Sequence, residues 1–154
     1  MSETLSPAER SEIERACERV VYAYSRALDV GDMNAAAECF AEHGSLTRPM
    51  APEQVISGRD NIRASLLTRP KSLLTKHLAT NVMIDVEGRE AARGISYLTM
   101  IATTAAEAAQ PPFVAHGPIY FGEFKDRYVR ENGVWKILER RGSIQMKFSG
   151  AAPP

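Results

Sequence analysis

The sequence predicts an α+β fold in which three amino-terminal helices pack on one face of a strongly bent antiparallel sheet. Two observations carry this prediction. Before residue 70, apolar residues recur at spacings of three and four, the period of amphipathic helices. After residue 74, four long segments rich in β-branched and aromatic residues follow one another, each bounded by turn residues. Helices followed by a run of strands are typical of an α+β domain.

The first helix is predicted to begin at Pro7 and to end at Gly31. Ser6 can cap this helix, Pro7 suits the first helical position, and Glu9 completes a capping box. The residues predicted to form its buried stripe are Ile13, Cys17, Val20, Val21, Tyr24 and Leu28.

Two shorter helices are predicted next. Asp32 is expected to cap a helix that continues through Phe40, and its inward side chains are expected to be Met33, Ala36, Ala37 and Phe40. A third helix is predicted between Gly58 and Pro70, with Ile62, Leu66 and Leu67 on its buried side.

Four strands are predicted at Thr75–Val86, Ala91–Thr104, Ile119–Arg130 and Val134–Phe148. Residues 87–89 and 131–133 have hairpin-turn chemistry, and residues 105–115, which contain two prolines, are predicted to be a loop. The strands are longer than the usual ~5–6 residues, so we expect the sheet to bend strongly.

The length and charge of the chain limit the classes of protein to which it can belong. The chain has 154 residues, 44% of them hydrophobic, which fits one globular domain over residues 1–154 with flexible tails at 1–6 and 149–154. Its 19 basic and 19 acidic side chains cancel, which argues against nucleic-acid and membrane partners. The two cysteines lack a CxxC motif, and the polar amino terminus lacks a secretory signal, so we expect a cytoplasmic protein.

His77 is the first candidate for catalysis. Strand alternation places it on one face with Thr75, Ala79, Asn81 and Met83, a polar and small set that suits a pocket wall. The opposite face is predicted to be the apolar core face, with Leu78, Thr80, Val82, Ile84 and Val86. A neutral imidazole is a natural general base near pH 7. A solvated or purely structural histidine is the alternative.

Several segments together resemble the SnoaL-like, nuclear-transport-factor-2-like superfamily. They are residues 24–32, 40–44, 58–62, 76–81 and 126–137, within a resemblance that spans roughly residues 8–148. The resemblance implies a cone-shaped α+β barrel that encloses a pocket between the sheet and the first helix. It also implies a homo-oligomer, a trimer or a dimer, formed through the outer face of the sheet.

Within this superfamily, the chain is similar to scytalone dehydratase, hexachlorocyclohexane dehydrochlorinase and the bile-acid dehydratases. The similarity implies that Asp29 and His77 form a dyad, in which His77 removes a proton from carbon and a leaving group departs. Helix geometry points Asp29 away from the buried stripe, so a solvated aspartate is the alternative. Only the dyad matches scytalone dehydratase, and the aspartate base of the ketosteroid isomerases falls at Arg48.

Other side chains complete the predicted site. Tyr24 lies in the buried stripe, where its hydroxyl would either polarise a substrate carbonyl or bond to the backbone. The candidates for substrate binding are Asn81, Tyr97, Tyr120, Phe124 and Trp135. His43 and His116 are weaker candidates, and no cluster has the spacing of metal ligands.

The sequence thus predicts a cofactor-independent lyase of the dehydratase type that acts on a small hydrophobic, ring-containing substrate. Two alternatives stay open. One is a non-catalytic ligand-binding protein or dioxygenase small subunit, and the other is an isomerase or cyclase that uses the same pocket.

Overall fold

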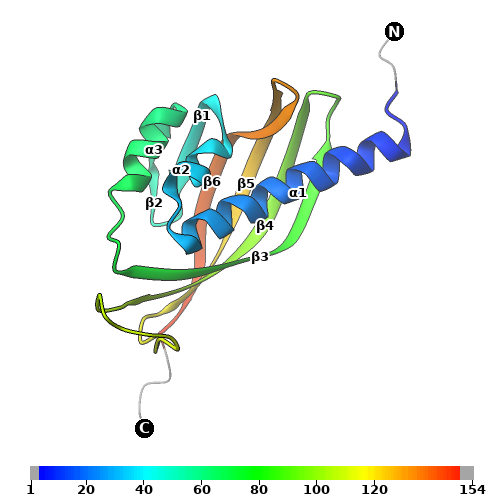
Figure 1. Ribbon diagram of the computed structural model, residues 1–154. Helices are drawn as coiled ribbons and strands as arrows, with labels where there is room; N and C mark the ends of the chain where they lie inside the picture. Colours follow the sequence, from blue (N-terminus) through cyan, green and yellow to red (C-terminus); the bar gives the residue numbers. More distant parts are fainter. Residues whose placement is uncertain (1–3, 150–154) are drawn as a thin grey trace.

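The computed structural model describes residues 4–149, which form three helices and one six-stranded sheet (Figure 1). Their bounds are α1 Pro7–Val30, α2 Met33–Glu38, β1 Phe40–Arg48, β2 Ala51–Ser57, α3 Arg59–Leu67, β3 Leu73–Val86, β4 Ala91–Thr104, β5 Ile119–Glu131 and β6 Val134–Phe148. The predicted α+β class, with its three helices and four long strands, is confirmed.

The sheet is curved and does not close on itself. Its strand order is β2-β1-β6-β5-β4-β3, and every neighbouring pair is antiparallel except β1 with β6, which is parallel. Figure 1 shows α1 running across one face of the sheet, with α2 and α3 beside the β1 end. The helices therefore cover the concave face, and the outer face is left without helices.

Helix α1 follows the predicted pattern closely. Ser6 Oγ accepts from the Glu9 N–H at 3.2 Å and Glu9 Oε2 accepts from the Ser6 N–H at 2.8 Å, which is the predicted capping box. Gly31 ends the helix with a φ of +79°, a left-handed conformation that favours glycine. The predicted stripe is buried, apart from Val20, which is partly buried.

Strands β1 and β2 were not predicted, and they make the sheet mixed rather than wholly antiparallel. Phe40 is fully buried, as expected, but it begins β1, because α2 already ends at Glu38. The register of β1 with β6 shifts between Phe40 and Ser45, and a Cβ on Gly44 would lie 2.9 Å from the Ile137 carbonyl oxygen. This irregular, glycine-containing strand lacks the alternation by which strands are recognised.

The face of α3 was predicted correctly at Ile62 and Leu66 but wrongly at Leu67, which is 57% exposed. The helix has only nine residues, and Leu67 is its last. In the last turn of so short a helix only one side chain faces the core, and that side chain is Leu66.

Strand β3 contains a bulge that changes the predicted facing of its side chains. Thr80 pairs with Tyr97 and Met83 with Ile95, so two residues of β3 oppose the single Ser96 of β4. Asn81 adopts a φ of +50° at this point. The residues packed toward the core are therefore Thr75 and Ala79 before the bulge and Val82, Ile84 and Val86 after it. Leu78 and Thr80, predicted to face the core, are exposed on the outer face.

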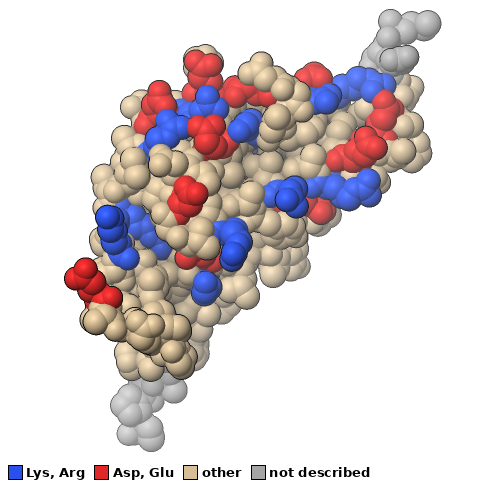
Figure 2. All heavy atoms as spheres, in the orientation of Figure 1, with Lys and Arg blue, Asp and Glu red and all other residues tan. Residues whose placement is uncertain are grey.

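The predicted tails lie partly outside the described residues, which exclude 1–3 and 150–154. Within the described part, Leu5 packs against the core and Ser6 caps α1. No helix in residues 4–149 is long and apolar enough to cross a membrane. On the face seen in Figure 2, basic and acidic side chains are interspersed, with no broad area of one sign.

Candidate functional site

Asp29 and His77 are in direct contact in the folded chain. Asp29 lies in the last turn of α1 and His77 lies five residues into β3. Their side chains meet at 2.6 Å between His77 Nδ1 and Asp29 Oδ1. The backbone N–H of His77 donates to Asp29 Oδ2 at 2.9 Å. Both carboxylate oxygens are thus held by one residue, and the aspartate points toward the sheet rather than sideways into solvent.

Asp29 receives a third hydrogen bond from the hydroxyl of Thr75, at 3.0 Å. Burial disfavours the charged carboxylate, but the bonds from the His77 ring, the His77 N–H and Thr75 outweigh it and hold the pKa of Asp29 below its ordinary value. Asp29 is therefore ionised at neutral pH and accepts a hydrogen bond from the Nδ1–H of His77. That arrangement leaves the lone pair on Nε2 of a neutral His77.

The Asp29–His77 pair is nearly enclosed, yet one ring nitrogen is free. The side chains of His77 and Asp29 are only 7% and 10% exposed. Within residues 4–149, Nε2 of His77 has no hydrogen-bond partner. An imidazole held through Nδ1 and unpartnered at Nε2 has the arrangement of a general base.

Tyr24 lies on the same helix as Asp29, five residues earlier, and its side chain is 4% exposed. Its ring packs edge-to-face against Phe40 and Phe124, with centroids 5.7 and 6.4 Å away. Its hydroxyl makes no hydrogen bond with any described residue, so the alternative of a tyrosine bonded to the backbone does not apply. Burial raises the pKa of Tyr24, which keeps the hydroxyl protonated and able to donate.

A fully buried arginine, Arg140, packs against the ring of Tyr24. Its guanidinium lies 4.6 Å from the Tyr24 ring centroid and 4.3 Å from that of Phe124. Two of its nitrogens bond to Asp126, at 2.8 and 2.6 Å, and Nη1 has no partner among the described atoms. Asp126 also accepts from the Tyr128 hydroxyl at 2.7 Å.

The sequence reasoning missed Arg140 and Asp126, although a signal was present. Phe124, Asp126 and Tyr128 alternate on one strand, so a carboxylate stands between two inward aromatic rings. A buried carboxylate needs a cation. Arg140 was harder to place, because a register shift in β6 near Glu139 breaks its alternation with Ile137.

The structure brings two of the five predicted substrate-binding residues to the concave face near the pair. Phe124 packs on Tyr24 and Arg140. Tyr120 is opposite Met100, which is itself opposite His77. Directly opposite residues share a face, so the Tyr120 side chain lies on the His77 face, two strands away, or roughly 10 Å.

The other three predicted substrate-binding residues lie elsewhere. Asn81 is exposed at the bulge, and Tyr97 is 53% exposed on the outer face. Trp135 packs beside Ile13 and Ala16, in the first half of α1. Ala16 and Asp29 are 13 residues apart, which is about 20 Å of helix. The structure therefore does not bring these three residues together with His77.

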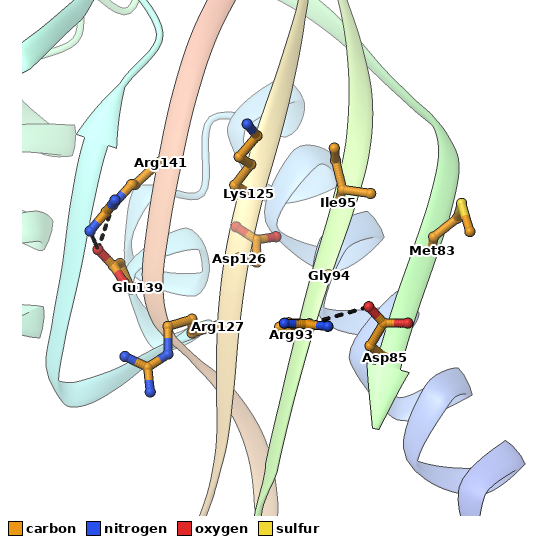
Figure 3. A pocket seen from close by; sticks show the side chains of 10 residues that line it. All are labelled: Met83, Asp85, Arg93, Gly94, Ile95, Lys125, Asp126, Arg127, Glu139 and Arg141. Carbon is orange, nitrogen blue, oxygen red and sulfur yellow. Dashed lines mark hydrogen bonds and ion pairs between the residues drawn. The ribbon is translucent and has the colours of Figure 1, made fainter. Parts of the chain in front are cut away.

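The hollows that stand out on the described surface are not lined by Tyr24, Asp29 or His77. One of 530 Å³ opens on the outer face of the sheet (Figure 3). There Arg93 pairs with Asp85 and Arg141 with Glu139, while Asp126 turns toward the opposite face, where it binds Arg140. Within residues 4–149, no group of three His, Cys, Asp or Glu side chains is arranged to hold a metal ion.

The fold is shared with several solved structures. A provisionally named scytalone dehydratase from Novosphingobium aromaticivorans is 23% identical, with a TM-score of 0.78 over 96% of this chain and 94% of that one. A hexachlorocyclohexane dehydrochlorinase is 17% identical, with a TM-score of 0.77 over 97% and 99%. A protein of unknown function from Mycobacterium tuberculosis is 25% identical, with a TM-score of 0.70 over 93% and 78%.

A comparison with curated proteins found no match. The sequence itself matches the SnoaL-like domain over residues 9–141, a range that runs from the first turn of α1 to the middle of β6 and includes the Asp29–His77 pair. The chain therefore belongs to the SnoaL-like domain family.

Proposed function

We propose that this protein is a cofactor-independent lyase that eliminates water from a small, ring-containing β-hydroxy carbonyl compound. The observation that carries the proposal is the contact of His77 Nδ1 with an ionised Asp29, which leaves Nε2 without a partner among the described residues. Similarity to proteins named as a scytalone dehydratase and a dehydrochlorinase agrees with elimination chemistry.

In the first step, Nε2 of His77 takes the proton from the carbon next to the substrate carbonyl. The C–H electron pair moves toward that carbonyl and forms an enolate, while Asp29 stabilises the imidazolium. A general base of this kind contributes typically 10²–10⁴-fold to the rate.

The Tyr24 hydroxyl donates to the enolate oxygen, since it is protonated and has no partner among the described residues. In the second step the enolate collapses, a carbon–carbon double bond forms and the β-hydroxyl leaves. The imidazolium returns its proton to the leaving oxygen. The products are an α,β-unsaturated carbonyl compound and water, and no electron acceptor is needed.

We further propose that the protein is a homo-oligomer, joined through the outer face of the sheet, and that it acts in the cytoplasm. Leu78, Thr99, Phe121 and Met146 lie opposite one another in a single row across four strands. Leu78 and Met146 are 48% and 65% exposed. A second copy of the chain would cover this apolar row. Both cysteines are free, as in a reducing compartment.

The proposal is tested with a panel of ring-containing β-hydroxy ketones, in which elimination is followed by the ultraviolet absorbance of the conjugated product. We expect turnover by the wild type that rises with pH and falls at least hundredfold in His77→Ala. His43→Ala is the matched control, because His43 is an exposed histidine on β1, and its turnover should equal that of the wild type.

Three outcomes would contradict the proposal. Equal turnover by His77→Ala and the wild type would remove His77 from the chemistry. Binding of panel compounds without turnover by any variant would leave a ligand-binding or subunit role. Rearranged products without loss of water would favour an isomerase or cyclase.

A further inference from the structure

Two arginines lie at the carboxyl-terminal end of α3, near the Asp29–His77 pair. Arg48 ends β1, and its Nη2 donates to both the carbonyl oxygen and the hydroxyl of Ser65, each at 2.7 Å. The backbone N–H of Arg69 donates to the Leu66 carbonyl oxygen at 3.1 Å. Both residues are thus anchored in the last turn of the same short helix.

Arg69 is connected to the pair through Thr75. Its Nη2 donates to the Thr75 hydroxyl, and that hydroxyl donates to Asp29. The Arg69 guanidinium therefore lies one hydrogen-bonded residue away from the carboxylate that holds His77. The remaining Nε and Nη1 groups of Arg69 have no partner among the described residues.

Gly142 on β6 leaves room for Pro49, the residue that directly follows Arg48 at the end of β1. A Cβ on Gly142 would lie 2.5 Å from Pro49 Cγ, so only glycine lets Pro49 pack directly on β6. Leu46, two residues before Arg48, is buried in the core. The pairing of β1 with β2 is irregular between Thr47 and Arg48, and the hydrogen bonds of Arg48 to Ser65 show that its side chain points toward α3.

The two guanidiniums lack anionic partners. Neither forms an ion pair with a carboxylate in residues 4–149, whereas Arg59, Arg63, Arg93, Arg140 and Arg141 each do. Burial and the charge of Arg48 lower the pKa of Arg69, against the influence of Asp29 and Tyr24. The charge of Arg48 also acts to lower the pKa of the Tyr24 hydroxyl, against the larger effect of burial, which raises it. Two like charges with unused donors are therefore held beside the Tyr24 hydroxyl, which has no hydrogen-bond partner among residues 4–149.

A purely structural role explains only part of this arrangement. A cation at the end of α3 satisfies its carbonyls and its dipole, and Nη2 of Arg48 does so. A single cation meets that need, however, and a second one beside it is repelled. Five N–H groups per guanidinium exceed what Ser65 and Thr75 can accept.

We propose that Arg48 and Arg69 bind a carboxylate of the substrate, so that the protein prefers a ring-containing compound that carries a carboxylate over its neutral counterpart. This inference rests on the proposed function, since it concerns the same site. The planar fork of a guanidinium matches a carboxylate in two-point hydrogen bonding. The carboxylate would bind at the α3 side of the concave face, and the apolar ring would lie toward Phe124 and Tyr120.

Binding is measured by isothermal titration calorimetry with three acids, namely benzoate, 2-naphthoate and 3-phenylpropanoate, each compared with its primary amide. We expect the wild type to bind at least one acid ten times more tightly than the amide. Arg48→Gln and Arg69→Gln should each lose at least fivefold of that preference, with little change for the amide. Arg63→Gln is the matched control, because Arg63 lies on α3 but is paired with Glu38 and Asp60.

The salt dependence provides a test that needs no variant. Acid binding by the wild type should weaken between 20 and 500 mM NaCl, roughly threefold or more, while amide binding stays constant. The inference is overturned by equal binding of acid and amide in all three pairs. It is also overturned by an acid preference that the glutamine variants retain, or by acid binding that salt does not change.

The two proposals fail in different ways. His77→Ala should keep the acid preference, because His77 is not part of the carboxylate site. Turnover of neutral hydroxy ketones with no acid preference would overturn this inference and leave the lyase. An acid preference without turnover of any hydroxy compound would overturn the lyase and leave an acid-binding protein.

Discussion

At the scale of single residues, Asp29 decides what His77 can do. Its three hydrogen bonds come from the His77 ring, the His77 backbone and Thr75. They keep the carboxylate ionised in a setting that is only 10% exposed. The charge orients the imidazole and offsets the charge that the ring gains when it removes a proton.

Asp29→Asn should retain the fold but lower turnover about hundredfold or more, because an amide cannot fix the same tautomer with a full charge. Turnover is measured on the hydroxy-ketone panel. Thr80→Val, an exposed change on β3, the strand of His77, is the control. Wild-type turnover in Asp29→Asn would contradict the role of Asp29.

The lowered pKa of Asp29 predicts a pH dependence of stability, which the Asp29→Asn variant tests. The pKa of Asp29 is lowered by folding from its ordinary value of 3.8, so its ionisation stabilises the native state above that pH. The stabilisation is lost as the pH falls below 3.8. The difference in unfolding free energy between wild type and Asp29→Asn should therefore shrink between pH 7 and pH 3, as measured by urea denaturation. A difference that grows toward low pH would show that the sign is wrong.

Tyr24→Phe should separate catalysis from stability. Its hydroxyl has no partner among residues 4–149, so its loss should cost less than about 1 kcal/mol of stability. Turnover should fall roughly tenfold to hundredfold if the hydroxyl donates to the enolate. Tyr22→Phe is the matched control, since Tyr22 is 48% exposed on the same helix. Equal turnover in the two variants would remove Tyr24 from the mechanism.

At the scale of elements, the bulge in β3 places two kinds of residue on the concave face. Thr75 and Ala79 face inward before it, and Val82, Ile84 and Val86 face inward after it. Without the extra residue, either His77 or the Val82–Val86 set would turn to the outer face. The bulge therefore lets one strand supply both a catalytic candidate and the core.

Substitutions at Asn81 test this bulge. At a φ of +50°, a β-branched side chain is strained, so Asn81→Val should lower the unfolding free energy by about 1–2 kcal/mol. Asn81→Gly should stay within about 0.5 kcal/mol of the wild type. Thermal denaturation provides the measurement, with Thr80→Val as the neighbouring control. A valine variant as stable as the glycine variant would argue against the left-handed conformation.

At the scale of the whole molecule, the two faces of the sheet have different environments. The concave face is covered by helices and holds the Asp29–His77 pair. The outer face carries exposed apolar side chains from four neighbouring strands, among them Leu78, Tyr97 and Met146. Strands of 13 to 15 residues extend well past the span of the core, which makes room for both.

If copies of the chain associate through the apolar row, a charge placed in it should disrupt them. Met146→Lys and Phe121→Lys should shift the protein toward the monomer, as measured by sedimentation equilibrium. Desolvating an unpaired ammonium in an interface is unfavourable. Val55→Lys is the control, because Val55 is 65% exposed on β2, outside the row. An unchanged mass in both row variants would place the interface elsewhere.

Local patterns were enough to predict much of the fold. The capping box at Ser6 and Glu9, the stripe of α1, and the four long strands with their turns all depend on neighbours in sequence. Such signals are encoded in spacing and in side-chain chemistry. His77 could be chosen as a candidate from its strand face, whereas Asp29 was a candidate only through the resemblance to the family, because helix geometry points it away from the buried stripe.

The remaining features depend on contacts between distant segments. The pairing of β1 with β6 joins residues about 95 positions apart. No local alternation of apolar and polar residues in β1 predicts this pairing. The bulge at Asn81 shifts the phase of a strand by one residue, which reverses every facing beyond it.

By itself, the sequence determined the class of fold, the ends of α1 and the long strands, and it offered His77 and Asp29 as candidates for proton transfer. Only the tertiary structure decided that Asn81, Tyr97 and Trp135 lie apart from His77, and that Arg48, Arg69 and Arg140 lie near Tyr24. The physical reason is that periodicity reports the environment of one segment, whereas a site is formed where segments meet. Burial of Arg140 beside Asp126 depends on that meeting, because neither charge could be buried alone.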